Sequence, residues 1–147
     1  MGEEKGENKG DEKFRAIRGR VEEEPFARKM GLRLLEVEEG RALVEMKFAE
    51  EMENIFGMAH GGAIFSLIDE AFEVAANSYG TVAVALSMTV NYVSSPKKGE
   101  TLRAEAREVD RSKRVATYEI RVATEGGDLI AVCQALAYRK RDPLPFL

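Results

Sequence analysis

Residues 60–77 read HGGAIFSLIDEAFEVAAN, and this stretch decides the fold. Apolar side chains recur within it at every third or fourth position and cover most of the circumference of a helix, which we expect from residue 61 to residue 77. A helix this apolar has to be enclosed by the rest of the chain. Its few polar side chains fall on one stripe, made of Ser66, Asp69, Glu70, Glu73 and Asn77.

Strand-like segments surround this helix. Two precede it, at residues 32–37 and 42–48, with a tight turn at Glu39-Gly40 between them. Four follow it, and the connections among these four are short and turn-like, so consecutive strands should pair antiparallel. We therefore predict an α+β fold in which a curved antiparallel sheet packs on one long helix. The four later strands are expected at residues 82–93, 101–110, 115–124 and 129–139.

The start of the chain differs from the rest. Residues 1–13 are nearly all glycine, asparagine and charged residues, which cannot bury enough apolar surface to offset the entropy lost on ordering. We expect this segment to be a disordered charged tail, followed by one domain over residues 14–147. Phe14, Ile17 and Val21 then predict a short helix, which Pro25 should end.

Composition limits the classes of function. No apolar run reaches the roughly 18–20 residues of a membrane span, the N-terminus resembles no secretory signal, and the single cysteine, Cys133, cannot form an internal disulfide. These features predict a cytoplasmic protein without a membrane segment. A net charge of −4 argues against a nucleic-acid partner. The content of 33% charged residues with only one glutamine resembles the amino-acid composition of proteins from thermophiles. One histidine and one cysteine form no metal-ligand cluster, and no serine nucleophile elbow is present.

The single histidine stands immediately before the apolar helix, in His60-Gly61-Gly62. A glycine pair at a helix start leaves backbone N–H groups uncovered, at the positive end of the helix dipole. Such a corner can stabilise the oxyanion that develops on an attacked carbonyl. The plainer interpretation, a capping turn where the chain passes close to the sheet, stays open.

Asp69 is a candidate base or nucleophile on the same helix. It follows His60 by nine residues, which is about 900° of rotation and about 13 Å of rise. One chain therefore cannot bring both the Gly61 N–H and the Asp69 carboxylate to one substrate carbonyl. Either the two features are unrelated, with Asp69 on a solvated polar stripe, or a second copy with an antiparallel helix completes the site. A two-fold dimer offers that arrangement.

Order and spacing of these residues match a known family. Asn54, five residues, His60-Gly61-Gly62 and then FSLIDEAF at residues 65–72 resemble the hotdog-fold acyl-CoA thioesterases, most closely their phenylacetic-acid-pathway branch. The resemblance covers roughly residues 24–140. It implies a hotdog fold, in which a sheet wraps a long central helix.

The resemblance also implies roles for single residues. Gly61 matches the glycine whose N–H polarises the thioester carbonyl, and Asp69 matches the carboxylate that attacks the thioester or activates water from the facing subunit. His60 matches a histidine that orients the loop and supports substrate binding. Asn54 matches a residue that positions substrate or water, and Ser87 a strand hydroxyl of the same pocket. By themselves, Asn54 could be only a turn residue and Ser87 an outward-facing hydroxyl.

Substrate contacts are expected from backbone and basic residues. Gly62 adjoins the oxyanion corner, and CoA phosphates need cations. Two pairs of basic residues in turns could supply these cations, and residues 139–141 are a weaker choice. Ordinary solvated charges in turns would give the same sequence pattern, so that interpretation stays open. The basic pairs are Lys97-Lys98 and Lys113-Arg114.

These observations predict an acyl-CoA thioester hydrolase for a small acyl group, aromatic ones such as phenylacetyl included. It should need no cofactor, since CoA enters only as part of the substrate. We expect a homodimer that assembles further into a dimer of dimers, with the apolar residues 143–147 packing on a neighbouring subunit. The alternative is a hotdog protein that binds acyl-CoA without catalysis. The hydratase branch of the fold fits poorly, because it pairs Asp and His at a shorter spacing.

Overall fold

The computed structural model describes residues 9–147, which form three helices, one short 3-10 helix and six strands. One helix, α3, corresponds to the predicted apolar helix residue for residue. The elements in chain order are α1 (Lys9–Glu23), α2 (Pro25–Met30), β1 (Arg33–Glu38), β2 (Arg41–Lys47), η1 (Glu50–Met52), α3 (Gly61–Asn77), β3 (Thr81–Tyr92), β4 (Thr101–Arg111), β5 (Val115–Thr124) and β6 (Leu129–Pro143).

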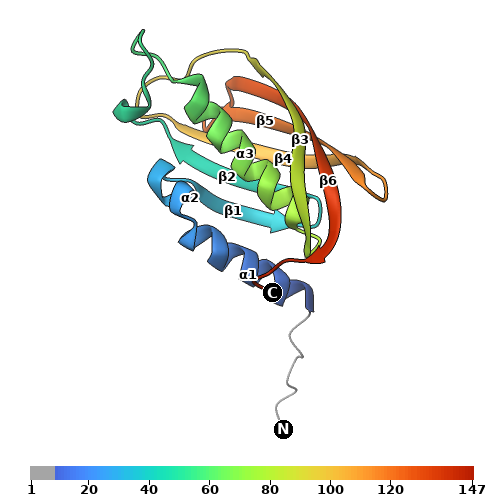
Figure 1. Ribbon diagram of the computed structural model, residues 1–147. Helices are drawn as coiled ribbons and strands as arrows, with labels where there is room; N and C mark the ends of the chain where they lie inside the picture. The colour runs from blue at the N-terminus through green and yellow to red at the C-terminus, as the bar shows by residue number, and fades with distance from the viewer. Residues whose placement is uncertain (1–8) are drawn as a thin grey trace.

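All six strands form one antiparallel sheet in the order β1-β2-β4-β5-β6-β3. The sheet curves around α3, which crosses its concave face (Figure 1). This is the predicted α+β hotdog architecture. The two edges of the sheet differ: α1 lies alongside β1, where Arg18 donates to the Leu35 carbonyl at 3.2 Å, whereas β3 forms the opposite edge.

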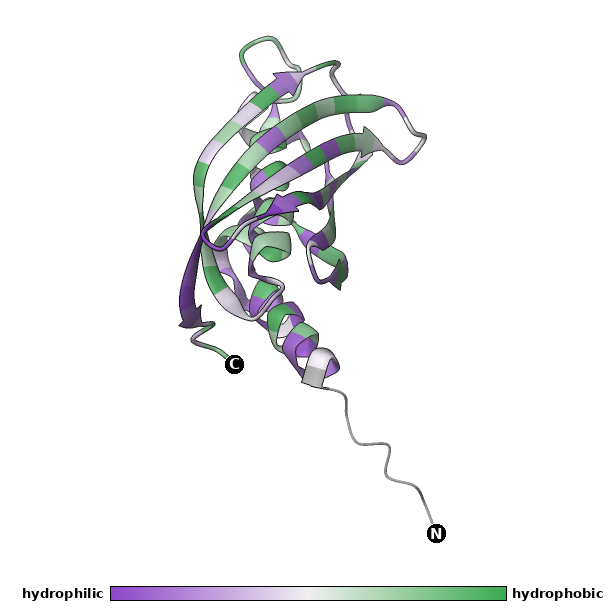
Figure 2. Cartoon of the chain, turned by 90° about the vertical axis from the view of Figure 1, so that its right-hand side faces the viewer, coloured by the Kyte–Doolittle hydropathy of each residue, from purple (hydrophilic) through white to green (hydrophobic). Residues whose placement is uncertain are grey.

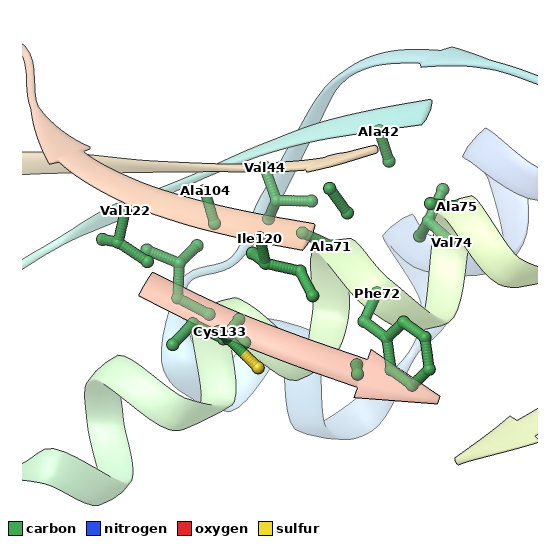
Figure 3. Packing of buried hydrophobic residues seen from close by; sticks show 14 of the residues in the cluster. Ala42, Val44, Ala71, Phe72, Val74, Ala75, Ala104, Ile120, Val122 and Cys133 are labelled. Carbon is green, nitrogen blue, oxygen red and sulfur yellow. The ribbon is translucent and has the colours of Figure 1, made fainter. Parts of the chain in front are cut away.

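Alternation along the strands explains which face meets the helix. Hydrophobic and hydrophilic residues alternate as bands along the strands (Figure 2), because successive side chains point to opposite faces. The inward positions of the sheet include many alanines, which let it approach α3 closely (Figure 3). Larger side chains fill the remaining space, and Phe72 of α3 meets the Tyr118 ring edge-on at 5.4 Å. The inward alanines of the strands include Ala42, Ala104, Ala106, Ala116, Ala135 and Ala137.

The N-terminal prediction needs a correction. Residues 9–13 belong to α1 and are not a disordered tail, while residues 1–8 lie outside the described part of the chain. Contacts distant in sequence hold the helix: Lys13 Nζ lies 2.8 Å from Glu39 Oε1, and Ile17 and Val21 are buried in the core. Pro25 ends this helix as predicted, and α2 begins there.

The C-terminal prediction also changes. β6 runs four residues beyond its expected end, because Pro143 still pairs with Thr81 of β3. Leu144 then packs into the core of its own chain and its N–H donates to the Gly80 carbonyl at 3.0 Å. Residue 144 is thus held within the chain, not on a neighbouring subunit.

None of the helices within residues 9–147 is long and apolar enough to cross a membrane.

Ser78 joins the end of α3 to the β1–β2 turn. Gly40 occupies that turn with a φ of 75°, in the left-handed region that favours glycine. The Gly40 N–H donates to Ser78 Oγ at 2.8 Å, and Ser78 Oγ donates to the Ala75 carbonyl at 2.7 Å. Ser78 has no exposed surface. One hydroxyl therefore satisfies two buried backbone groups.

We predict that Ser78→Ala lowers the free energy of unfolding by about 1–3 kcal/mol, because it leaves the Gly40 N–H buried without an acceptor. Denaturant unfolding followed by circular dichroism measures the change. The matched variant Ser95→Ala, at an exposed loop position, should stay within about 0.5 kcal/mol of the parent. Equal losses in the two variants would contradict this role of Ser78.

Candidate active site

The start of α3 is capped by its own histidine. His60 is the N-cap residue in an extended conformation, and the Gly62 N–H donates to its Nδ1 at 2.8 Å. With Nδ1 as acceptor, the neutral ring carries its proton on Nε2. Glycine suits position 62, because a β-carbon there would lie 3.0 Å from Nδ1, a tight contact that the imidazole ring would have to shift to relieve. The N–H of Gly62 is thus occupied, which removes this residue from the N–H donors expected to contact a substrate.

Gly61 differs from its neighbour. Its N–H makes no hydrogen bond within residues 9–147, whereas its carbonyl accepts from the Tyr92 hydroxyl at 3.1 Å. Gly61 and Tyr92 line a cavity of about 300 Å³ together with Asn54, Ser94 and other residues of the neighbouring loops. One uncovered N–H at a helix N-terminus therefore borders an open cavity, which is the requirement for holding an oxyanion.

Asn54 shapes the loop before the helix. Its Oδ1 accepts from the N–H groups of Phe56 and Met58 at 2.9 and 3.1 Å, and its backbone N–H donates to the Met58 carbonyl. Asn54 is therefore a turn residue, as one interpretation of the sequence had it, because its side-chain oxygen is used within the loop. The same residue also lines the cavity at Gly61, so its amide can still serve a ligand there.

Asp69 lies a little over two turns beyond Gly61 along α3, in a second cavity of about 290 Å³. Asp69 is exposed in one chain, as on a solvated stripe, but desolvation by the cavity wall raises the pKa of its carboxyl group above the ordinary value, and the nearby Glu24 carboxylate raises it further. Both effects make Asp69 a stronger base. The cavity is lined mainly by α3, α2 and β3, through Phe26, Ser66, Phe72, Ala83, Val84 and others.

Within one chain the two cavities stay separate. Gly61 borders the first and Asp69 the second, at opposite ends of a nine-residue stretch of regular helix. The structure thus agrees with the geometric expectation that one chain does not unite the two groups. Ser87 lies on the edge strand β3, where it is exposed and pairs with Leu136 of β6.

The predicted basic residues divide into two groups. Lys97 lines a cavity with Ser94 and Ser95, which also border the Gly61 cavity, and Lys98 lies 3.4 Å from Glu50. This pair therefore belongs to the end of the molecule where α3 begins.

Lys113 and Arg114 lie in the β4–β5 turn, near the other end of the same helix. Arg111, just before that turn, stacks on Tyr79, which follows the C-terminal end of α3. The chain therefore does not bring Lys113 and Arg114 to the Gly61 cavity.

Two features of the site escaped the sequence interpretation. Tyr92 was not assigned to the site, although its hydroxyl donates to the Gly61 carbonyl. Glu70 was assigned to a solvated stripe, yet it is only 3% exposed. Since each residue turns a helix by about 100°, Glu70 lies at the margin of that stripe, where the fold of α2 over α3 decides its burial. No sequence signal reports where α2 packs.

Comparisons with known proteins agree with this geometry. The family model described as the thioesterase superfamily matches residues 56–131. A putative esterase of Archaeoglobus fulgidus is 41% identical over 113 residues, which are 77% of this chain and 73% of that protein. Acyl-coenzyme A thioesterase PaaI of Escherichia coli is 31% identical over 118 residues, covering 80% of this chain and 84% of that protein.

Solved structures give the same result. The E. coli PaaI protein from the phenylacetic acid degradation operon superposes with a TM-score of 0.86 at 28% identity, over 91% of this chain and 97% of that one. A Streptococcus mutans protein solved with bound acetyl CoA superposes with a TM-score of 0.73 at 26% identity, over 77% and 91%. The chain therefore belongs to the thioesterase superfamily, as a PaaI-type thioester hydrolase with the hotdog fold.

Proposed function

We propose that the protein hydrolyses acyl-CoA thioesters as a homodimer, with Gly61 of one subunit and Asp69 of the other at each active site. The observation that carries this proposal is the uncovered N–H of Gly61. The N–H of Gly62 is capped by His60, so the helix start offers a single oxyanion donor toward its cavity.

The edge strand β3 supports a dimer. An edge strand presents unpaired N–H and C=O groups, and natural proteins cover or pair such edges. Four successive residues of β3, Val84 to Ser87, are exposed in one chain, and the side chain of Leu86 is 56% exposed. The adjoining cavity with Asp69 is open along this same strand, through Ala83 and Val84. A second copy of the chain that pairs along β3 would cover both the exposed edge of this strand and the opening of the Asp69 cavity.

A two-fold axis also accounts for the spacing within α3. If the axis passes beside Phe65, midway between Gly61 and Asp69, the two α3 helices run antiparallel. Residue 61 of one helix then lies opposite residue 69 of the other. The eight-residue separation of Gly61 and Asp69 that prevents a site within one chain is thus the separation that builds two equal sites in a dimer.

The chemistry needs few groups. The thioester carbonyl oxygen accepts a hydrogen bond from Gly61 N–H, which stabilises the negative charge that forms there. In one route, Asp69 of the partner subunit takes a proton from water as the hydroxide adds to the carbonyl carbon, and the tetrahedral intermediate expels the CoA thiolate, which receives that proton. In the other route, Asp69 itself adds to the carbonyl carbon and the CoA thiolate leaves. Water then hydrolyses the resulting anhydride, which releases the acid and supplies the proton of the thiol. A thiolate leaves readily, so no strong acid for the leaving group is required.

The substrate follows from the relatives and the charges. E. coli PaaI is named an acyl-coenzyme A thioesterase, and the Streptococcus mutans structure holds acetyl CoA. In our proposal Lys97 and Lys98 bind CoA phosphates at the Gly61 cavity, and Lys113 and Arg114 reach CoA only from another subunit. A dimer of dimers would supply such a subunit. We further propose that the substrates carry small acyl groups, aromatic ones included. The proposed location of the protein is the cytoplasm.

A non-catalytic acyl-CoA-binding protein is the second candidate. Asp69 argues against it, because desolvation and the nearby Glu24 carboxylate raise the pKa of its carboxyl group even though the side chain is exposed in one chain. Placing two carboxylates side by side costs free energy, and a protein that only binds the thioester has no use for this arrangement.

We predict that Asp69→Asn lowers kcat for acyl-CoA hydrolysis by about 100-fold or more, because it removes the base while keeping the side-chain shape. Free-thiol release from acetyl-, branched-chain-, medium-chain- and phenylacetyl-CoA measures this loss. The matched control Asp110→Asn changes an exposed aspartate of β4 and should keep parental activity.

Two outcomes would count against the proposal. If Asp69→Asn turns over like the parent, Asp69 is not the catalytic carboxylate. If the parent releases no thiol from any of these thioesters while acyl-CoA raises its melting temperature, the binding candidate is the better account.

We predict that Gly61→Pro lowers kcat about 10²–10³-fold, the loss typical of one oxyanion donor. Proline suits this exchange, because it removes the N–H at the first helical position, where proline is favoured. The ψ of 132° at His60 also fits a residue before proline. Gly61→Ala is the control: it keeps the N–H, and its β-carbon would lie 3.4 Å from Tyr92, an ordinary contact. Similar kcat values for the two variants would contradict the assignment.

A further inference from the structure

Three glutamates converge in the cavity beside Asp69. Glu24 is the N-cap residue of α2, and Glu70 and Glu73 lie on α3. One carboxylate oxygen of each lies within 4.8 Å of the other two. All three side chains line the cavity of about 290 Å³. The packing of α2 over α3 therefore brings Glu24 next to Glu70, although the two residues are 46 positions apart in the sequence.

Glu70 is the buried member of this cluster. The residue is 3% exposed, and its Oε1 is the one buried side-chain oxygen or nitrogen within residues 9–147 that has no hydrogen-bond partner. The charged neighbours that act on it are Glu24 and Glu73, both carboxylates, so no lysine or arginine of the described chain compensates it. A buried carboxyl group in this position needs a proton or a cation.

Electrostatics point in the same direction. The three carboxyl groups lie within 4.8 Å of one another, so desolvation and the neighbouring carboxylates raise the pKa of buried Glu70 and of Glu73, which is exposed at the rim of the cavity. The cluster thus resists carrying three uncompensated negative charges at neutral pH.

The spacing of the oxygens fits one metal ion. Ligand oxygens of Ca²⁺ lie about 2.3–2.6 Å from the ion and those of Mg²⁺ about 2.0–2.1 Å, so two ligands of one ion are separated by at most about 4–5 Å. The limit of 4.8 Å among the three glutamates meets this condition. Protons can link these carboxyl groups only in pairs, and Glu70 lies within hydrogen-bonding reach of both Glu24 and Glu73, whereas one ion contacts all three groups at once.

We propose that Glu24, Glu70 and Glu73 bind one hard divalent cation, of the Mg²⁺, Mn²⁺ or Ca²⁺ class, in the cavity beside Asp69. All-oxygen ligands select this class, and water completes the coordination. The ion ties the start of α2 to the middle of α3. Its positive charge also opposes the effect of Glu24 on Asp69 and lowers the pKa of that carboxyl group.

This site differs from the sequence prediction, which counted histidine and cysteine ligands and expected no metal. Hard cations need neither residue. Because the glutamates must lose protons to bind the ion, binding should strengthen as the pH rises.

The test is a titration of the full chain with Mn²⁺, followed by the electron paramagnetic resonance signal of free Mn²⁺. We expect one bound ion per chain, with a lower Kd at pH 8 than at pH 6. Glu70→Gln and, separately, Glu24→Gln should each weaken binding at least about tenfold, the smallest loss common for disturbed metal sites. Glu22→Gln, at an exposed position of α1, should leave Kd unchanged. Mn²⁺ should raise the melting temperature of the parent and of Glu22→Gln only.

No binding at either pH would overturn the site, and so would binding that Glu70→Gln and Glu24→Gln leave intact. The carboxylates would then be neutralised by protons alone. Since neither measurement uses a thioester, failure of the metal site is distinguishable from failure of the proposed hydrolase.

Discussion

The apolar contact between α3 and the concave face of the sheet positions everything else in this protein. Leu67, Ile68, Ala71 and Ala75 are completely buried, so α3 has no freedom to rotate or slide. Its N-terminus is thereby fixed against Tyr92 of β3, and its polar stripe is directed to the open edge of the sheet. The alanines on the facing strands make this close contact possible, because larger side chains would hold the sheet away from the helix.

That fixed helix explains the charge distribution around it. A single rigid element carries the uncovered N–H of Gly61 and, eight residues later, the Asp69 carboxyl group with its raised pKa. The start of α2 then adds Glu24 beside Glu70 and Glu73, which concentrates four carboxyl groups in one cavity together with Asp69. Such crowding opposes stability and persists only where the surrounding fold enforces it, which is why we connect it with ligand binding.

Local pattern was sufficient to predict the central elements. The bounds of α3 and β5 were predicted to the residue, because a long 3.6-residue period and a clean alternation are strong signals. Long-range contacts decide what was missed. Residues 140–143 carry charges and do not resemble a strand, yet pairing with β3 extends β6 through them. The helix at residues 9–13 depends on Lys13 reaching Glu39, and the burial of Glu70 depends on α2.

For the candidate site, the sequence predicted which residues take part better than it predicted the contacts among them. Gly61 and Asp69 stand out in the sequence, and their separation alone raised the question of a second subunit. The capping of Gly62 by His60 Nδ1, which leaves only Gly61 uncovered, is a matter of side-chain geometry that no spacing reveals. Asn54 likewise combines a turn and a cavity wall, which sequence reasoning had treated as alternatives.

The most direct test of the central claim is subunit mixing. Chains with Gly61→Pro and chains with Asp69→Asn are refolded together in equal amounts, and thioesterase activity is compared with that of each variant alone. If each site joins Gly61 of one subunit to Asp69 of the other, a mixed dimer has one intact site, and a random mixture recovers about a quarter of parental activity. If each site lies within one chain, every chain in the mixture is defective, and activity stays at the level of the separate variants.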